Sequence, residues 1–235
     1  MSKNILDQNI IVFIVLYTII VISDLICSSH DSYLYLRYFT KPAILGSLII
    51  FLLVVKKRLN RFTFRIIGLA LLFSLAGDVL LLFTHISQLF FMMGLIMFLL
   101  AHIMYIVTFL KNRGAYKNRL FLLFTIVYGV GLFYLLYPGL GEMLIPVVIY
   151  MVVILLMSNV SYLRSKHVSR TSYILVFAGS LFFMLSDSLL AIDKFYEALP
   201  LGNIWIMSTY AIAQFLIVYG VVSQKELQKS TKIEF

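Results

Sequence analysis

The chain has 235 residues, of which 62% are apolar and only 12% charged, and its mean hydropathy is +1.02. These values exclude a soluble globular protein and are typical of an integral membrane protein. With 4 prolines, 12 glycines and one cysteine, the chain is neither collagen-like nor disordered, and it has no disulfide or cysteine-metal framework. The net charge of +9 lies in short loops between apolar runs, which indicates membrane orientation rather than nucleic-acid binding.

Eight apolar runs are long enough to span a bilayer, since a spanning helix needs about 20 apolar residues that rise about 1.5 Å each. In chain order they cover residues 9–26, 38–55, 66–83, 89–110, 120–137, 143–162, 173–192 and 204–222. The loops between them are too short to hold another domain. The sequence therefore predicts an all-α fold, a polytopic bundle of eight transmembrane helices that forms a single transmembrane domain over residues 1–235.

Positive charges are distributed unequally between the two sides of the predicted bundle. The even-numbered loops and the two termini hold 16 of the 19 Lys and Arg residues, whereas the odd-numbered loops hold only Arg37, Lys41 and Lys194. Because Lys and Arg are retained on the cytoplasmic side of a membrane, we expect both termini to be cytoplasmic. In a bacterial host the membrane would be the inner (cell) membrane. The 16 residues are Lys3, Lys56, Lys57, Arg58, Arg61, Arg65, Lys111, Arg113, Lys117, Arg119, Arg164, Lys166, Arg170, Lys225, Lys229 and Lys232.

The seventh run resembles the third when the two are aligned with an offset of 109 residues. The offset pairs Leu72, Phe73, Asp78, Leu80 and Leu81 with Leu181, Phe182, Asp187, Leu189 and Leu190. Matched leucines occur by chance in membrane sequences, but two matched aspartates are harder to attribute to chance. Since an offset of four helices preserves chain direction, a true repeat would divide the bundle into two parallel four-helix halves.

Two aspartates enter the membrane at one depth. Asp78 and Asp187 each lie five residues before the outer end of a predicted helix, roughly 8 Å inside the boundary, and ionisable groups there indicate a functional site. Each follows a small residue, Gly77 or Ser186, which lets a helix or ligand approach closely. We expect both carboxylates to face one cavity, with the third and seventh helices close together. The alternative is that each snorkels outward or pairs with Lys41 or a tyrosine. A solvated position is favoured instead for three aspartates at helix ends or in loops, Asp24, Asp31 and Asp193.

Other polar residues lie in or near the runs. Lys41 precedes Pro42 at the start of the second helix, where it can anchor the helix or contact a phosphate. His102 and Tyr105 share one face of the fourth helix, and Tyr210 and Gln214 one face of the eighth. The estimated depth of His102, about 20 Å, places it well below the aspartates and predicts a packing or substrate-wall role. The other three histidines lie in loops, so no set of about three zinc ligands converges.

At these residues the chain resembles the YhhN family of eight-helix membrane proteins, whose characterised members are lysoplasmalogenases. The resemblance covers nearly the whole chain and rests on motifs that are weak singly but fairly specific in this order. They are Lys41-Pro42, LLFSLAGDVLLL at 71–82, FMMGLIMFLLAHIMY at 91–105, SLFFMLSDSLLA at 180–191 and YAIAQFLIVYG at 210–220.

The resemblance implies an ether hydrolase that cleaves the vinyl-ether bond of a lysoplasmalogen to a fatty aldehyde and a glycerophospho-headgroup, although another ether lipid or lysolipid is an open alternative. Vinyl-ether hydrolysis needs an acid and an anion, and two carboxylates in a weakly polar pocket can divide these roles. Asp78 and Asp187 are the candidate catalytic residues, with no assignment between acid and base. We expect no metal or organic cofactor. The expected partners are a lysophospholipid or other ether-lipid substrate and the lipid bilayer, with no nucleic acid and no assignment of oligomeric state. The candidate substrate-binding residues are Lys41, His102, Tyr105, Tyr210 and Gln214.

The main alternative is a proton-coupled transporter of a small or lipid-like solute, because paired intramembrane acids and internal repeats are common in such carriers. Three features count against it. The repeats run parallel, no pair of helices is broken by Gly or Pro at midplane, and both acids lie near one surface. A lipid-binding receptor is a third option.

Overall fold

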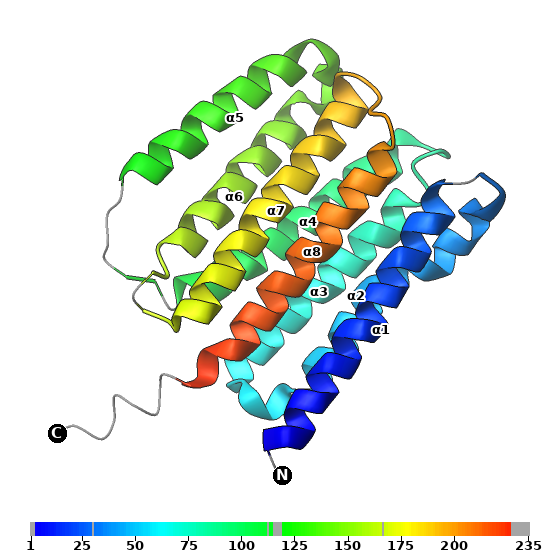
Figure 1. Cartoon of the computed structure of the whole chain (residues 1–235). Helices are drawn as coiled ribbons and strands as arrows, with labels where there is room; N and C mark the ends of the chain where they lie inside the picture. The colour runs from blue at the N-terminus through cyan, green and yellow to red at the C-terminus, as the bar shows by residue number, and fades with distance from the viewer. Residues whose placement is uncertain (1–2, 30, 112, 115–118, 166, 227–235) are drawn as a thin grey trace.

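The computed structural model describes residues 3–29, 31–111, 113–114, 119–165 and 167–226. Within these ranges the chain folds into eight long α-helices that lie side by side, with no strand (Figure 1). The all-α, polytopic prediction is thereby confirmed. The helices are α1 (Lys3–Ser29), α2 (Arg37–Val54), α3 (Arg61–Leu81), α4 (Gln88–Leu110), α5 (Arg119–Leu140), α6 (Leu144–Tyr162), α7 (Arg170–Phe195) and α8 (Gly202–Val222).

The number of spanning segments differs from the predicted eight. Seven helical stretches in the described chain are long and apolar enough to cross a membrane, and one of them, Arg119–Tyr162, has 44 residues. This stretch contains α5, the short 3-10 helix η3 (Gly141–Met143) and α6. Gly141 adopts a left-handed φ of +47°, so the chain reverses there with almost no loop, and α5 packs against α6.

The first residues of α3 and α7 are set by polar capping side chains and not by the start of the apolar runs. The Asn60 side chain accepts a hydrogen bond from the Thr63 backbone N–H at 2.9 Å and so caps the start of α3. The helix therefore begins five residues before the predicted apolar run and includes the charged residues Arg61 and Arg65. Ser169 caps α7 in the same way, through the backbone N–H of Ser172.

Two helix pairs form the most extensive contacts, α3 with α4 and α7 with α8. Glycines allow their backbones to approach closely. A methyl group on Gly179 of α7 would lie 3.0 Å from the Ala213 carbonyl oxygen of α8, and one on Gly220 would lie 3.0 Å from the Val176 backbone nitrogen. Because α7 and α8 occupy the places of α3 and α4 under a four-helix offset, this pairing agrees with two parallel halves.

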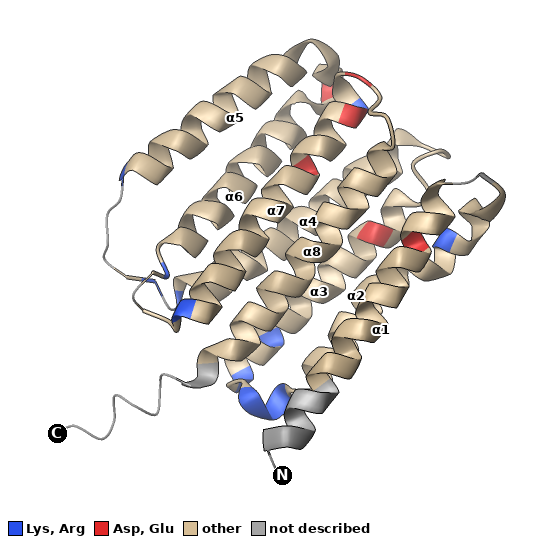
Figure 2. Cartoon of the chain, viewed as in Figure 1, with Lys and Arg blue, Asp and Glu red and all other residues tan. Residues whose placement is uncertain are grey.

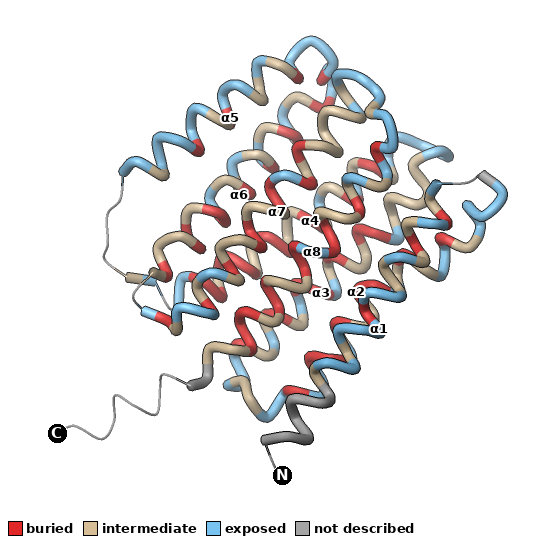
Figure 3. Tube along the Cα trace, in the orientation of Figure 1, coloured by how far each residue is buried: buried red, intermediate tan, exposed pale blue. Residues whose placement is uncertain are grey.

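The outside of the bundle is apolar and its charges lie at the two ends. Exposed residues follow the outward faces of the helices, and many are large apolar side chains such as Ile50, Leu123 and Val152 (Figure 3). Lys and Arg gather at the end that carries the α2–α3, α4–α5 and α6–α7 connections, which we call the basic end (Figure 2). Lys117, Lys166, Lys229 and Lys232 lie outside the described residues, and the side chains of Lys3 and Lys225 are not described. This apolar belt is that of an integral, multi-pass membrane protein.

Candidate active site

Asp78 and Asp187 line one cavity of about 670 Å³ at the end of the bundle opposite the basic end. Its walls come from α2, α3, α4, α7 and α8, and from the 3-10 helix η1 (Asp31–Leu36). Exposed residues such as Tyr35 and Lys194 lie at its mouth. The expectation that the two carboxylates face one cavity is confirmed. The expected close contact of α3 with α7 is wrong, because α3 packs mainly against α4 and α7 mainly against α8.

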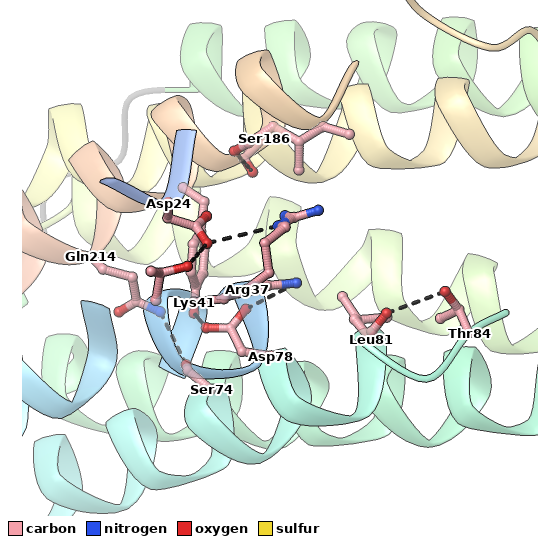
Figure 4. Close-up of polar contacts among 12 residues, drawn as sticks. Asp24, Arg37, Lys41, Ser74, Asp78, Leu81, Thr84, Ser186 and Gln214 are labelled. Atoms are coloured by element: carbon pink, nitrogen blue, oxygen red, sulfur yellow. Dashed lines mark hydrogen bonds and ion pairs between the residues drawn. The ribbon is translucent and has the colours of Figure 1, made fainter. Parts of the chain in front are cut away.

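Asp78 is almost completely buried and has two polar neighbours, the Lys41 ammonium (Figure 4) and the Tyr210 hydroxyl. Its Oδ1 is 3.7 Å from the Lys41 Nζ, and its Oδ2 accepts a hydrogen bond of 2.8 Å from the Tyr210 hydroxyl. Lys41 itself is 6% exposed and lines the same cavity. The lysine favours the charged form of the carboxylate by direct attraction, which opposes the cost of burying the charge.

Asp187 has a different set of neighbours. Its Oδ2 accepts a hydrogen bond of 2.5 Å from the Tyr150 hydroxyl of α6 and lies 3.8 Å from the His102 Nε2 of α4. No Lys or Arg ion pair to Asp187 is found among the described residues. The His102 ring packs edge-on against Tyr150 and Phe183, and its two nitrogens form no hydrogen bond within the described chain.

The predicted separation of His102 from the two aspartates is therefore wrong for Asp187. Side chains on an α-helix lean toward its N-terminus, and α4 and α7 run in opposite directions. His102 thus leans toward the cavity, while Asp187 leans toward the basic end, and the two side chains converge. In addition, α7 extends to Phe195, three residues past the predicted end, which places Asp187 deeper than the sequence suggested.

The remaining predicted site residues divide into two groups. Lys41 and Tyr210 lie on the cavity wall. Tyr105 and Gln214 do not; they lie in the core, as does His102. The Tyr105 hydroxyl donates a 2.5 Å hydrogen bond to the Gln214 Oε1, and the Gln214 Nε2 donates to the Ser74 hydroxyl at 3.0 Å. This polar chain ties α3, α4 and α8 together below the carboxylates.

The site follows the 109-residue repeat of the sequence. Asp78 and Asp187 are equivalent under this offset, and so are their partners Lys41 and Tyr150. Tyr105 and Gln214, also 109 residues apart, bond to each other. The two halves therefore supply matching positions but different chemistry, because the residue equivalent to the Lys41 cation is the Tyr150 phenol. Tyr150 was missed by the sequence predictions, although applying the offset to Lys41 would have found it.

Asp24 is also part of the site region, contrary to the solvated position expected for it. It is fully buried, because α1 continues to Ser29 and the first turns of α2 pack against it. Its Oδ1 accepts a hydrogen bond from the Thr40 hydroxyl at 2.7 Å and is 3.7 Å from the Arg37 Nε (Figure 4). Asp193 lies at the cavity mouth and accepts a hydrogen bond from the Leu199 backbone N–H at 2.8 Å.

Comparison with known proteins places the chain in a family. The model of the YhhN family matches residues 36–221, a range that contains every predicted site residue and also Tyr150. The chain belongs to the YhhN family. No solved structure matches the chain.

The chain is also similar to two mammalian proteins. The chain is 33% identical over 165 residues to the lysoplasmalogenase TMEM86A of Homo sapiens, and 32% identical over 166 residues to that of Bos taurus. Each alignment covers 68% of this chain and 66% of the relative, so the chain spans somewhat less than two thirds of the length of these proteins.

Proposed function

We propose that this protein is an integral-membrane, lysoplasmalogenase-like hydrolase of the vinyl-ether bond. The observation that carries the proposal is the pair of carboxylates, Asp78 and Asp187, on one cavity inside an apolar bundle. Membership of the YhhN family and similarity to two proteins named lysoplasmalogenase support the substrate class. The cavity volume is in the usual range for a small-molecule site, and its walls are largely apolar, with Leu81, Phe91, Phe98, Leu190 and Met207 among them.

In the proposed reaction Asp187 is the acid and Asp78 is the anion. The acid transfers a proton to the alkene carbon next to the ether-bearing carbon, and an oxocarbenium ion forms. Asp78 stabilises this cation and accepts a proton from the attacking water, which gives a hemiacetal. The hemiacetal then collapses: Asp187 takes back the hydroxyl proton, and Asp78 gives its proton to the glycerol oxygen as the C–O bond breaks. The fatty aldehyde and a glycerol hydroxyl are formed, one water is consumed, and both carboxyl groups regain their starting forms. Glycosidases use two carboxylates in a related way at an oxocarbenium-like transition state.

The neighbours of each carboxylate support this assignment. Lys41 stabilises negative charge on Asp78, as the anion role requires. Asp187 receives one hydrogen bond, from Tyr150 to Oδ2, which leaves Oδ1 to carry a proton toward the cavity. His102 contacts Asp187 from below and packs on Phe183, so we propose that it positions the acid instead of touching substrate. Tyr105 and Gln214 also have a positioning role in this proposal, because their hydrogen bond joins α4 to α8 below the two carboxylates.

The first prediction concerns the reaction itself. Purified protein in detergent, incubated with 1-alkenyl-glycerophosphoethanolamine, should release fatty aldehyde, detected by mass spectrometry. When the incubation is made in D2O, the aldehyde should carry one deuterium at carbon 2, because the mechanism protonates carbon. The matching 1-O-alkyl lipid, which has no double bond, should be stable. Absence of aldehyde would reject the hydrolase and favour a carrier, whereas aldehyde without deuterium would reject protonation at carbon.

We also propose that the basic end faces the cytoplasm and that both termini lie on that side. The support is the concentration of Lys and Arg on the even-numbered connections. In a bacterial cell the cavity would then open toward the outer leaflet of the inner membrane.

Reporter fusions test this orientation. Fusions after Leu59 and after Arg113, in two different connections at the basic end, should both report a cytoplasmic position. A fusion after Ile86, in the turn between α3 and α4, should report the opposite side and serves as the internal control. External signals at Leu59 and Arg113 would invert the proposed topology.

A further inference from the structure

The mouth of the cavity carries two cations that the proposed hydrolysis does not use. Arg37 lies in the first turn of α2 and Lys194 in the last turn of α7, and both line the cavity that holds Asp78 and Asp187. They come from opposite halves of the chain. Lys41, the third cation on the wall, is engaged with Asp78 and is not free for a ligand.

Arg37 is held in place, but only part of its guanidinium group contacts an anion. The residue is 8% exposed, and its Nε lies 3.7 Å from the Asp24 Oδ1, too far for a hydrogen bond. Nε is buried without a hydrogen-bond partner among the described residues. Asp24 contacts only one edge of the planar guanidinium (Figure 4), which leaves the terminal N–H groups for a second anion.

Lys194 complements Arg37 from α7. Its Nζ lies 5.3 Å from the centre of the Phe91 ring, and Phe91 is itself part of the cavity wall. The Lys194 side chain is exposed, but its ammonium lies over an aromatic ring of the cavity wall. The neighbouring acid, Asp193, has its Oδ1 bonded to the Leu199 backbone N–H, and no ion pair with Lys194 is found in the described chain.

We propose that Arg37 and Lys194 form a phosphate subsite, which binds the headgroup phosphate of a lipid whose chain occupies the apolar part of the cavity. An arginine and a lysine suit a phosphate, since the first offers a planar fork of N–H groups and the second a mobile point charge. This inference rests on the proposed function, because a headgroup bound at the cavity mouth would place the ether bond near the two carboxylates. Such a subsite would distinguish the phosphate-bearing lysolipid of the proposed reaction from a neutral alkenylglycerol.

Binding of lipids that cannot be cleaved tests the subsite separately from catalysis. The probes are 1-O-alkyl-glycerophosphoethanolamine, 1-O-alkylglycerol with the same chain, and inorganic phosphate, each measured by its effect on the melting temperature of the purified protein. We expect the phospholipid to bind more tightly than the alkylglycerol. Lys194→Gln and Arg37→Gln should each weaken binding of the phospholipid about tenfold, a typical loss for a charge-assisted contact, with no change for the alkylglycerol. Inorganic phosphate, which lacks the chain, should give no shift.

Two further variants make the result decisive. Lys111→Gln removes a lysine of the basic end that also lies over an aromatic ring, Phe62, and it should bind both lipids normally. Arg37→Gln leaves Asp24 unpaired and can unfold the protein, so Arg37→Gln with Asp24→Asn provides a charge-balanced version. Equal binding of the two lipids by the unsubstituted protein would overturn the subsite, as would equal losses for both lipids in Lys194→Gln. A shift with phosphate alone would indicate a site for free phosphate instead of a headgroup. None of these outcomes depends on aldehyde release.

Discussion

Asp78→Asn and Asp187→Asn should each reduce the rate of aldehyde release at least about a hundredfold, the low end of general acid–base contributions. The amide preserves the shape of the side chain, but it can neither donate a carboxylic proton nor hold negative charge. Both carboxylates line one cavity, so both losses should appear in kcat for lysoplasmalogen. The measurement is the initial rate of aldehyde formation by each purified variant.

A matched control comes from the same cavity. Asp193 lies at the mouth and accepts one backbone hydrogen bond, which an amide oxygen can also accept. Asp193→Asn should therefore keep nearly all of its activity. Each variant needs a melting curve beside its rate, so that inactivity is not mistaken for unfolding. A folded double variant, Asp78→Asn with Asp187→Asn, that still released aldehyde near the normal rate would refute the two-carboxylate mechanism.

The helices could be predicted from the sequence because the bilayer imposes one simple rule, a run of about 20 apolar residues. The predicted runs fall inside or very near the observed helices. The ends were harder to predict, since residues such as Arg61 and Lys194 are helical although they are charged. Helix geometry continues through a polar interface when caps and snorkelling side chains satisfy the terminal groups.

The candidate site was only partly predictable. Depth counted along one helix places an aspartate in the membrane, and this was enough to bring Asp78 and Asp187 to one cavity. Depth could not decide which side chains touch, because helices differ in length and direction. His102 and Asp187 show this, since their side chains lean toward each other from antiparallel helices.

The sequence also could not show which charged side chains contact each other. Lys41 was interpreted from the sequence as an interfacial anchor or a phosphate contact, and its pairing with an aspartate was only the alternative to a shared cavity. In the structure the Lys41 Nζ lies 3.7 Å from the Asp78 Oδ1, although both aspartates also line one cavity. Asp24 lies near the end of an apolar run, which favours solvent, but the return of the chain through η1 buries it against α2. Both outcomes depend on contacts between helices, and no pattern within one helix reports them.

Lys41→Met should lower the stability of the protein strongly. Lys41 and Asp78 are both buried, and removal of one partner of a buried ion pair costs about 3–5 kcal/mol because the other charge is left uncompensated. For a chain of this size about 1 kcal/mol corresponds to roughly 2–4 °C, so the melting temperature in detergent should fall by roughly 10 °C. Thermal unfolding followed by circular dichroism measures the change.

The companion variants separate the charge of Lys41 from its packing. Lys41→Met with Asp78→Asn removes both charges and keeps a side chain that can bond to Tyr210, so the melting temperature should return close to that of the unsubstituted protein while activity stays absent. Tyr150→Phe removes the equivalent partner of Asp187. It should lower stability far less, by about 1 kcal/mol, because an acid that keeps its proton leaves no buried charge behind. Equal destabilisation by Lys41→Met and Tyr150→Phe would mean that both carboxylates are charged, and the division into one acid and one anion would then fail.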